Sequence, residues 1–354
     1  MNAAVLPPDR MGALRIAELS PANFAIVMAV GILGVDCRQQ GHERFGQAML
    51  ALAFVAWAVV AALGIAKAVR HPSHVLADLR SHARAPGFLT LVAGTSILGS
   101  LWLSLGLPPQ AGAWLGGLAA VLWVAVTYGV LIVLTLESDK PPLAEAISGT
   151  WLLIVVATQS IAIVAVLVGA GLAPPARLAL NFAATAMWLC GGMLYVWVIA
   201  LIFYRCAFFR MSPRDLAPTY WINMGAMAIS ALAGALLVVH TAGAPFLAGL
   251  LPLLRGGTVL YWAVGTWWIP FMAALTAWRA WRDRQSLRYE VGYWGIVFPL
   301  GMYSAATHEM AAALELDFLQ PVARAFFLLA LAVGMLTAAG LLRRVVRPRL
   351  QPRA

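Results

Sequence analysis

Long apolar segments alternate with short polar segments along almost the whole chain. A helix needs about 20 apolar residues to cross the hydrocarbon core of a bilayer. Several apolar segments begin at proline, as at Pro21, Pro86, Pro218 and Pro321, which suits the first turn of a helix because its N–H groups have no intrahelical acceptor. The pattern predicts ten membrane-spanning helices, at residues 21–36, 46–69, 86–106, 111–136, 148–170, 177–204, 218–240, 257–279, 291–312 and 321–342.

Two of the connections between these helices are very short. Residues 107–110 join the third and fourth helices, and residues 171–176 join the fifth and sixth. Connections of this length produce antiparallel helical hairpins. We therefore expect an all-α integral membrane fold in which five helical hairpins form one transmembrane domain, residues 1–354.

The composition requires lipid as the solvent. Hydrophobic residues make up 62% of the chain and charged residues 11%, whereas soluble domains average about half apolar and a quarter charged. The N-terminus lacks a signal-peptide cleavage pattern, so the first apolar segment is expected to remain as a membrane helix. The only cysteines, Cys37, Cys190 and Cys206, are far apart and predict neither a disulfide framework nor a thiolate metal site. No metal or cofactor is expected.

The distribution of positive charge indicates the topology. The net charge is +10, but the basic residues lie in short clusters between apolar segments and no nucleic-acid-binding motif accompanies them. If the N-terminus is cytoplasmic, 19 of the 24 lysines and arginines face the cytoplasm. This bias predicts a multi-pass protein of the cell (plasma or inner) membrane with both termini cytoplasmic, and no nucleic-acid partner.

The odd-numbered helices share a weak pattern of an aromatic residue near the start followed by small and hydroxyl-bearing residues. Close packing between helices is the simpler interpretation, because small residues let transmembrane helices approach each other. Recurrence in five alternate helices instead suggests a shared pore lining surrounded by bulkier, lipid-facing even-numbered helices. The candidate lining residues are Phe24, Gly31, Gly94, Thr95, Ser96, Thr158, Ser160, Gly225, Gly301 and Ser304.

Three segments, 21–32, 220–230 and 294–304, make the chain resemble the tellurite-resistance/dicarboxylate transporter family. This family includes the bacterial protein TehA, the yeast malate and sulfite transporters and the plant slow anion channel. The resemblance extends over nearly the whole chain. It implies five hairpins around a central pore with the odd-numbered helices inside, passage of small inorganic or organic anions, and a homotrimer. It also implies that a phenylalanine in the ninth helix closes the pore; the matching residue is Phe298.

Phe298 and the following Pro299 are physically suited to a gate. Proline cannot donate its backbone N–H and therefore kinks the helix, and an apolar ring in a narrow pore blocks it by bulk and dewetting. The alternative is that Phe298 only packs between helices. Farther along the same helix, His308 and Glu309 are candidates for coupling protons to anion movement, although an interfacial pair exposed to water would have the same sequence.

Other classes of function fit less well. A membrane-embedded enzyme would need a catalytic motif such as HExxH, and an ATP-driven pump would need a P-loop; the sequence has neither. Two modes of transport stay open. One is a gated anion channel, and the other is a proton-coupled carrier for a C4-dicarboxylate such as malate, or for sulfite.

Overall fold

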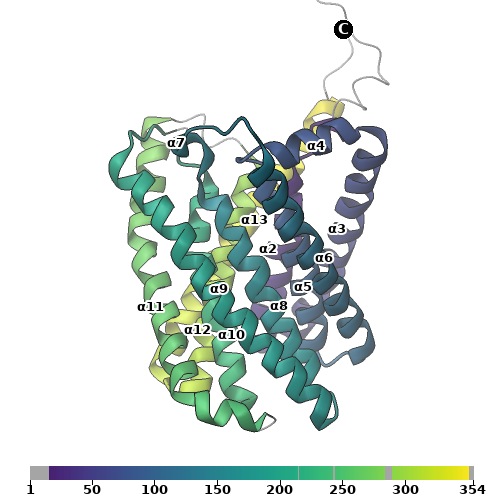
Figure 1. Cartoon of the computed structure of the whole chain (residues 1–354), viewed down its shortest axis with the longest axis vertical. Helices are drawn as coiled ribbons and strands as arrows, with labels where there is room; N and C mark the ends of the chain where they lie inside the picture. The colour runs from purple at the N-terminus through teal and green to yellow at the C-terminus, as the bar shows by residue number, and fades with distance from the viewer. Residues whose placement is uncertain (1–15, 214, 242–243, 284–288, 351–354) are drawn as a thin grey trace, which may run out of the picture.

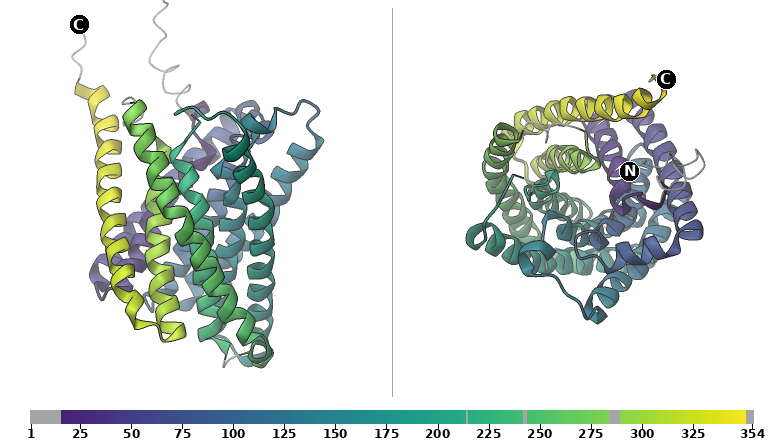
Figure 2. Two further views of the ribbon diagram at one scale, coloured as in Figure 1. Left: turned by 90° about the vertical axis from the view of Figure 1, so that its left-hand side faces the viewer. Right: turned by 90° about the horizontal axis from the view of Figure 1, so that it is seen from above.

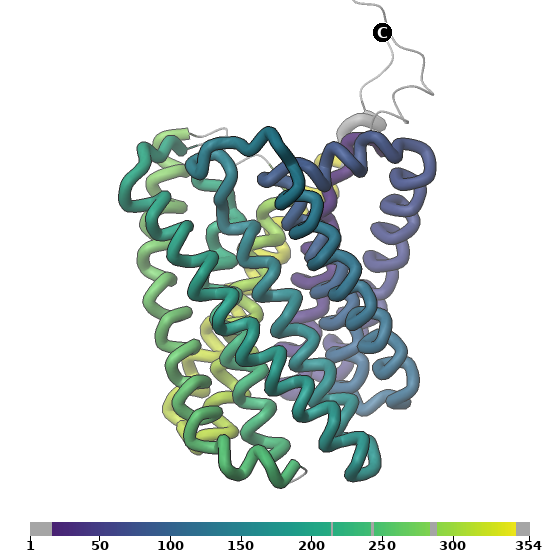
Figure 3. The backbone as a smooth tube through the Cα atoms, in the orientation of Figure 1, coloured from purple at the N-terminus to yellow at the C-terminus, as the bar shows by residue number. Residues whose placement is uncertain are grey.

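A computed structural model describes residues 16–213, 215–241, 244–283 and 289–350, with side chains up to residue 344. Within these ranges the regular structure is helical, and ten helices of 15 residues or more stand side by side in one bundle (Figure 1). The chain winds progressively around the bundle from one hairpin to the next (Figure 3). The all-α membrane fold predicted from hydropathy is thereby confirmed.

Five of the long helices form an inner group. Each begins with a short 3-10 turn, and proline lies within the turns at Pro21, Pro86 and Pro218. The inner helices, each with its preceding turn, are α2 (Ala25–Gln39) after η1 (Pro21–Phe24), α5 (Leu89–Ser104) after η2 (Ala85–Phe88), α8 (Leu153–Ala170) after η3 (Gly149–Leu152), α10 (Ile222–Val239) after η4 (Pro218–Trp221), and α12 (Trp294–Leu314) after η7 (Val291–Tyr293).

The other five long helices surround this group, as the view from above shows (Figure 2). They are α3 (Glu43–Arg70), α6 (Pro109–Leu136), α9 (Pro174–Phe208), α11 (Pro245–Arg282) and α13 (Gln320–Leu350), with η8 (Asp317–Leu319) preceding the last. Two short helices, α4 (Pro72–Arg80) and α7 (Leu143–Ala146), lie at the same end of the bundle (Figure 1). The alternation of inner and outer helices agrees with the predicted division between odd and even spans.

Burial separates the two groups clearly. In α2, α5, α8 and α10 with their 3-10 turns, 67–94% of the most apolar window is buried, against 17–28% in the five outer helices. The outer helices expose large apolar side chains such as Trp114, Phe182 and Leu336. A hydrocarbon environment accommodates such a surface, whereas water would not.

Among the described helices, nine are long and apolar enough to cross a bilayer. Of the ten long helices, α12 alone does not meet the criterion of mean hydropathy, although it has 21 residues and most of them are buried. Its sequence includes Pro299, Tyr303, His308 and Glu309, which lower its mean hydropathy. The count of ten crossings therefore stays a prediction.

The predicted boundaries differ most from the structure at the eighth span. Hydropathy places its start at residue 257, whereas α11 begins at Pro245 and includes Pro252. The sequence around residue 255 is typical of a loop, because it contains Pro252, Arg255, Gly256 and Gly257. A membrane helix tolerates them because neighbouring helices can satisfy the backbone groups that a proline leaves free.

Hydrogen bonds from tryptophans connect successive hairpins. In four cases an outer helix donates an indole N–H to a hydroxyl or carbonyl oxygen on the inner helix of the next hairpin; we call these bonds tryptophan latches. The donor and acceptor residues are Trp57 and Thr95, Trp123 and Thr158, Trp188 and Ser230 (carbonyl), and Trp262 and Thr307, with N···O distances of 2.9–3.0 Å.

The ring closes differently between the last and the first hairpins. No tryptophan occurs in α13. Like the other neighbouring inner helices, α12 packs directly on α2, and a methyl group at Gly301 would lie only 2.9 Å from Cγ2 of Ile32. At the end of the same contact, Nε2 of Gln39 donates to Oε1 of Glu309 across 2.9 Å. The five hairpins thus enclose a central axis lined by the inner helices.

Candidate functional site

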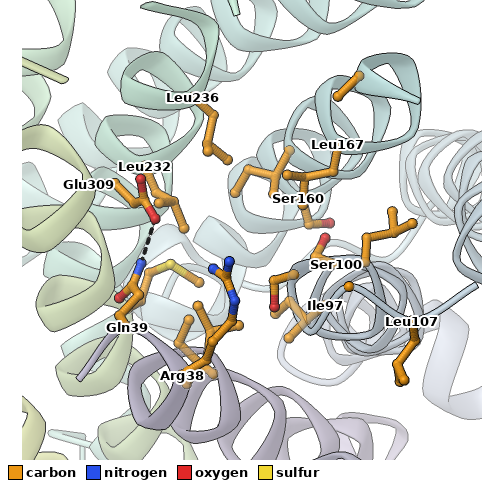
Figure 4. A pocket seen from close by; sticks show the side chains of 18 of the residues that line it. Arg38, Gln39, Ile97, Ser100, Leu107, Ser160, Leu167, Leu232, Leu236 and Glu309 are labelled. Carbon is orange, nitrogen blue, oxygen red and sulfur yellow. Dashed lines mark hydrogen bonds between the residues drawn. The ribbon is translucent and has the colours of Figure 1, made fainter. Parts of the chain in front are cut away.

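A cavity of about 380 Å³, here called cavity A, lies at the end of the bundle near the α5–α6 connection. All five inner helices contribute to its wall, and Figure 4 shows their side chains converging on it. Its lining includes Ile32, Val35, Arg38 and Gln39 of α2, Ile97, Ser100 and Ser104 of α5, Ser160, Ile163 and Leu167 of α8, Leu232 and Leu236 of α10, and Met302 and Glu309 of α12.

A second cavity, cavity B, has a volume of about 330 Å³ and lies where the 3-10 turns begin the inner helices. The same five units line it, so both cavities belong to the central axis. Its lining includes Ser20, Ala25 and Met28 of the first unit, Arg84, Gly87 and Thr90 of the second, Ser148, Thr150 and Leu153 of the third, Thr219 and Ile222 of the fourth, and Gly292, Trp294, Gly295 and Phe298 of the fifth.

The two cavities come closest to each other along α2 and α12. On α2, Met28 lines cavity B and Ile32 lines cavity A; on α12, Phe298 lines cavity B and Met302 lines cavity A. Each pair is four residues apart, and one helical turn advances about 5.4 Å. Along these two helices the cavities approach each other within roughly one turn, and Phe298, only 1% exposed, lies at this approach. On α5, α8 and α10 the nearest lining residues of the two cavities are seven to ten positions apart.

Phe298 is held by an unusual local backbone. Pro299 lies inside α12 and cannot donate a hydrogen bond to the carbonyl of Gly295, which itself lines cavity B. The proline ring packs against Gly225 of α10 so closely that a methyl group there would lie 2.8 Å from its Cγ. Glycine at 225 thus allows the kinked part of α12 to approach α10.

The hydroxyl-bearing residues predicted to line a pore divide into two groups. Ser160 lines cavity A, whereas Thr95 and Thr158 face outward and accept the tryptophan latches. Ser304 donates to the carbonyl of Ala323 on α13, and Ser96 donates to the carbonyl of Ser160. All but Ser160 hold helices together.

The glycines and Phe24 also lie away from the two central cavities. A methyl group at Gly31 would lie 2.7 Å from Cγ2 of Ile97, so this glycine mediates a close contact between α2 and α5. At Gly94 a methyl group would lie 3.4 Å from the carbonyl oxygen of Phe24, an ordinary van der Waals distance, so this glycine also faces the first unit. Gly225 and Gly301 mediate close contacts of α12. Phe24 lines a lateral cavity between inner and outer helices, together with Trp57 and Leu118. The packing interpretation of the small residues therefore fits the structure better than the pore-lining one.

His308 and Glu309 are adjacent in sequence but have different surroundings. Glu309 lines cavity A and accepts the hydrogen bond from Gln39. His308 does not line either cavity; its Nδ1 is buried and has no hydrogen-bond partner among the residues that the structure describes. Only the carboxylate is placed to meet a solute on the central axis.

Two arginines that lie outside the predicted membrane spans line the cavities. Arg38 lines cavity A, and Arg84 lines cavity B. Nε of Arg84 lies 2.5 Å from Oδ1 of Asp78, whose other oxygen lies 2.6 Å from Nζ of the buried Lys67. Each cavity therefore contains one guanidinium group. Their positions at helix ends carried no signal in sequence beyond topology.

Comparison with known proteins identifies the family. Residues 18–342 match the family described as voltage-dependent anion channel, which covers all five inner helices and both cavities. The chain belongs to this family. The match confirms the resemblance inferred from the three sequence segments.

Several relatives of this anion-channel family member are similar over part or most of their length. An uncharacterized membrane protein of Mycobacterium tuberculosis is 38% identical over 152 residues, which cover 43% of this chain and 77% of that protein. Two uncharacterized transporters of Methanocaldococcus jannaschii match as well. One is 30% identical over 34% of both chains, and the other is 22% identical over 83% of this chain and 84% of its own length.

Family membership and the transporter names support transport of anions across a membrane rather than an enzymatic function. The multi-pass membrane character is supported by the same matches and by the apolar helices. Across the described part of the chain, no group of three His, Cys, Asp or Glu side chains is placed to hold a metal ion.

Proposed function

We propose that this protein conducts small anions along the axis between cavities A and B, and that Phe298 closes the path. The observation that carries the proposal is the pair of cavities, both lined by all five inner helices and separated by a buried barrier that includes Phe298. An apolar ring blocks a narrow path by its bulk and by excluding water. Rotation of one side chain is enough to change such a barrier.

Anion preference follows from the walls of the two cavities. Serine and threonine hydroxyl groups on the walls offer weak hydrogen bonds, and each cavity adds one guanidinium group, Arg38 or Arg84. A solute must bind well enough to enter and weakly enough to leave. Arg38 raises the local concentration of anions in cavity A, whereas the charge of Arg84 is paired with Asp78. The segments of the inner helices between the two cavities contain no lysine or arginine.

A second candidate is a proton-coupled carrier for a C4-dicarboxylate such as malate, or for sulfite. Glu309 favours it, because a carboxylate that lines cavity A can accept a proton on the transport path. His308, by contrast, lies off the cavities and would act only through Glu309. A carrier accumulates its solute when a pH gradient is imposed, whereas a channel does not.

The cellular setting is part of the proposal. We place the protein in the cell membrane with both termini cytoplasmic, supported by the bias of basic residues toward one side. We also propose that it assembles as a homotrimer. The resemblance noted from sequence supports this assembly, and chemical crosslinking in native membranes tests it.

The decisive experiment compares anion currents of the wild type and Phe298→Ala in planar bilayers. Phe24→Ala is the matched control, because Phe24 is also a buried phenylalanine on the first turn of an inner unit but lines the lateral cavity. We expect Phe298→Ala alone to raise the conductance, with reversal potentials that follow the anion gradient. An equal rise with Phe24→Ala would contradict the gate.

The carrier is tested in liposomes that hold the same proteins. The carrier hypothesis predicts that an inward proton gradient drives uptake of malate or sulfite. If such uptake is seen and neither the wild type nor Phe298→Ala carries a current, the channel hypothesis is rejected in favour of the carrier. In that case Glu309→Gln is expected to abolish proton-driven uptake while leaving solute exchange measurable.

A further inference from the structure

Arg38 is an exposed arginine that lines cavity A. It lies in the last turn of α2, and its side chain extends from the wall toward the middle of the cavity (Figure 4). Within the described ranges, no carboxylate pairs with its guanidinium group and no protein group is hydrogen-bonded to it, so its N–H groups face water. A guanidinium group presents five N–H donors and stays charged at any pH that the protein meets.

The one carboxylate that lines the same cavity is engaged elsewhere. Oε1 of Glu309 accepts a hydrogen bond from Nε2 of Gln39 at 2.9 Å, drawn as the dashed line in Figure 4. The bond turns Glu309 toward the wall where α12 meets α2. The positive charge of Arg38 is therefore available to a solute rather than spent on an internal ion pair.

Three serine hydroxyls line cavity A together with Arg38. Ser100 and Ser104 come from α5, and Ser160 comes from α8. Each hydroxyl donates to a backbone carbonyl three or four residues earlier in its own helix. Such a bond can be exchanged for one to an incoming anion by rotation about the Cβ–Oγ axis, without moving the helix.

We propose that cavity A contains an anion-binding site centred on Arg38, with the hydroxyls of Ser100 and Ser160 as additional donors. This inference rests on the proposed function, in which the site would load anions before they reach Phe298. The planar fork of a guanidinium group matches two oxygens of one ligand. The site therefore prefers a planar oxyanion or a carboxylate to a halide.

The charge of the ligand is limited by Glu309. Its carboxylate lines the same cavity, so a second negative charge on the ligand would be repelled from that side. The site accordingly favours singly charged ligands such as nitrate or a monocarboxylate. This preference distinguishes it from a general attraction of anions to a basic surface.

The test measures binding directly, on the full chain purified in detergent, with nitrate as the ligand at constant ionic strength. Wild type, Arg38→Gln and Arg44→Gln are compared by the shift of Tm with nitrate concentration and by calorimetric titration. Arg44 is the matched control, because it is, like Arg38, an exposed arginine at the same end of the bundle, but it lies in the first turn of α3 and lines neither cavity.

We expect Arg38→Gln to weaken nitrate binding by about tenfold or more, the effect of losing one charged hydrogen-bonding group. Arg44→Gln is expected to bind like the wild type. Equal affinity in all three proteins would overturn the site. If Arg38→Gln does not fold, Arg38→Lys is used instead, because lysine keeps the positive charge but lacks the planar fork. Arg38→Lys is expected to lose the preference for nitrate over chloride. Retention of that preference would overturn the site.

The binding test also separates this inference from the proposed function. If nitrate binding depends on Arg38 but neither the wild type nor Phe298→Ala passes a current, the channel is rejected and the binding site is kept. If currents through Phe298→Ala saturate at the same nitrate concentration whether or not Arg38 is also replaced, the channel is kept and the binding site is rejected.

Discussion

The indole Nε1 of Trp57 on α3 donates a hydrogen bond to Oγ1 of Thr95 on α5, at a distance of 2.9 Å. The same hydroxyl donates to the carbonyl of Leu91, so the threonine links an outer helix to the backbone of an inner one. Three equivalent bonds follow around the bundle. The inner helices are thus fixed to a rigid outer frame from the side that faces away from the cavities.

Loss of one latch should lower stability modestly. Trp57→Phe keeps an aromatic ring and removes the donor, and hydrogen bonds between membrane helices are worth about 0.6 kcal/mol on average, up to roughly 1.7. A double-mutant cycle with Thr95→Val, followed by unfolding in mixed detergent, should give a coupling free energy in that range. The double-mutant cycle cancels the packing lost with the smaller ring. Trp114→Phe on the exposed surface of α6 is the control. A coupling free energy of zero would contradict the latch.

Enlarging Gly225 should damage the contact between α10 and α12. In Gly225→Ala the new methyl group would lie 2.8 Å from Cγ and 3.2 Å from Cα of Pro299, and neither atom belongs to a flexible chain. Overpacking of this kind costs about 1–3 kcal/mol, which thermal unfolding in detergent can measure. Gly117→Ala, where no atom lies within 4 Å, should be neutral or slightly stabilising. Equal stability of both variants would refute the close approach.

Neutralising Asp78 should be far more costly than neutralising a surface carboxylate. Asp78→Asn leaves the ammonium group of Lys67, whose side chain is 6% exposed, without its counter-ion, and breaking such a buried pair costs about 3–5 kcal/mol. Glu137→Gln removes the partner of Arg80, an exposed pair 3.5 Å apart, and should cost less than about 1 kcal/mol. Folded yield and Tm compare the two. Similar losses would show that Lys67 is not buried in the membrane-bound protein.

The proposed topology predicts a labelling pattern. In a variant with Cys37, Cys190 and Cys206 replaced by alanine, Gln110→Cys should react with a membrane-impermeant maleimide on intact cells. Asp139→Cys should react only after permeabilisation, because it lies at the opposite end of α6. The reverse pattern would place both termini outside the cell.

Hydropathy was sufficient to locate the helices because membrane spans must be long and apolar over their whole length. The first span, for example, is predicted to begin at residue 21, and η1 begins at Pro21. Charge clusters and short connections added the pairing into hairpins. The start of α11 was the main failure, since Pro252 and Arg255 are typical of loops in sequence yet lie inside the helix.

The lining of the central axis was much harder to predict. An inner helix is enclosed by protein on all sides, so polarity varies little around it. Thr95 and Ser100 are both hydroxyl-bearing residues of α5, but Thr95 faces α3 and Ser100 faces cavity A. Only the arrangement of the neighbouring helices distinguishes them.

Arg38 and Arg84 were not predicted to line the path, because the sequence places both residues in the connections between spans. In the fold these segments extend along the cavity walls.

The direction of the latches has a consequence for biosynthesis. Each latch joins a hairpin to the one that follows it in the chain, so it can form as soon as the next hairpin enters the membrane during translation. The contact of α12 with α2, including the bond between Gln39 and Glu309, joins segments 270 residues apart. Cavity A therefore acquires its complete wall only near the end of synthesis, and a ribosome-bound chain that stops before α12 leaves an open, unsealed arc in the bilayer.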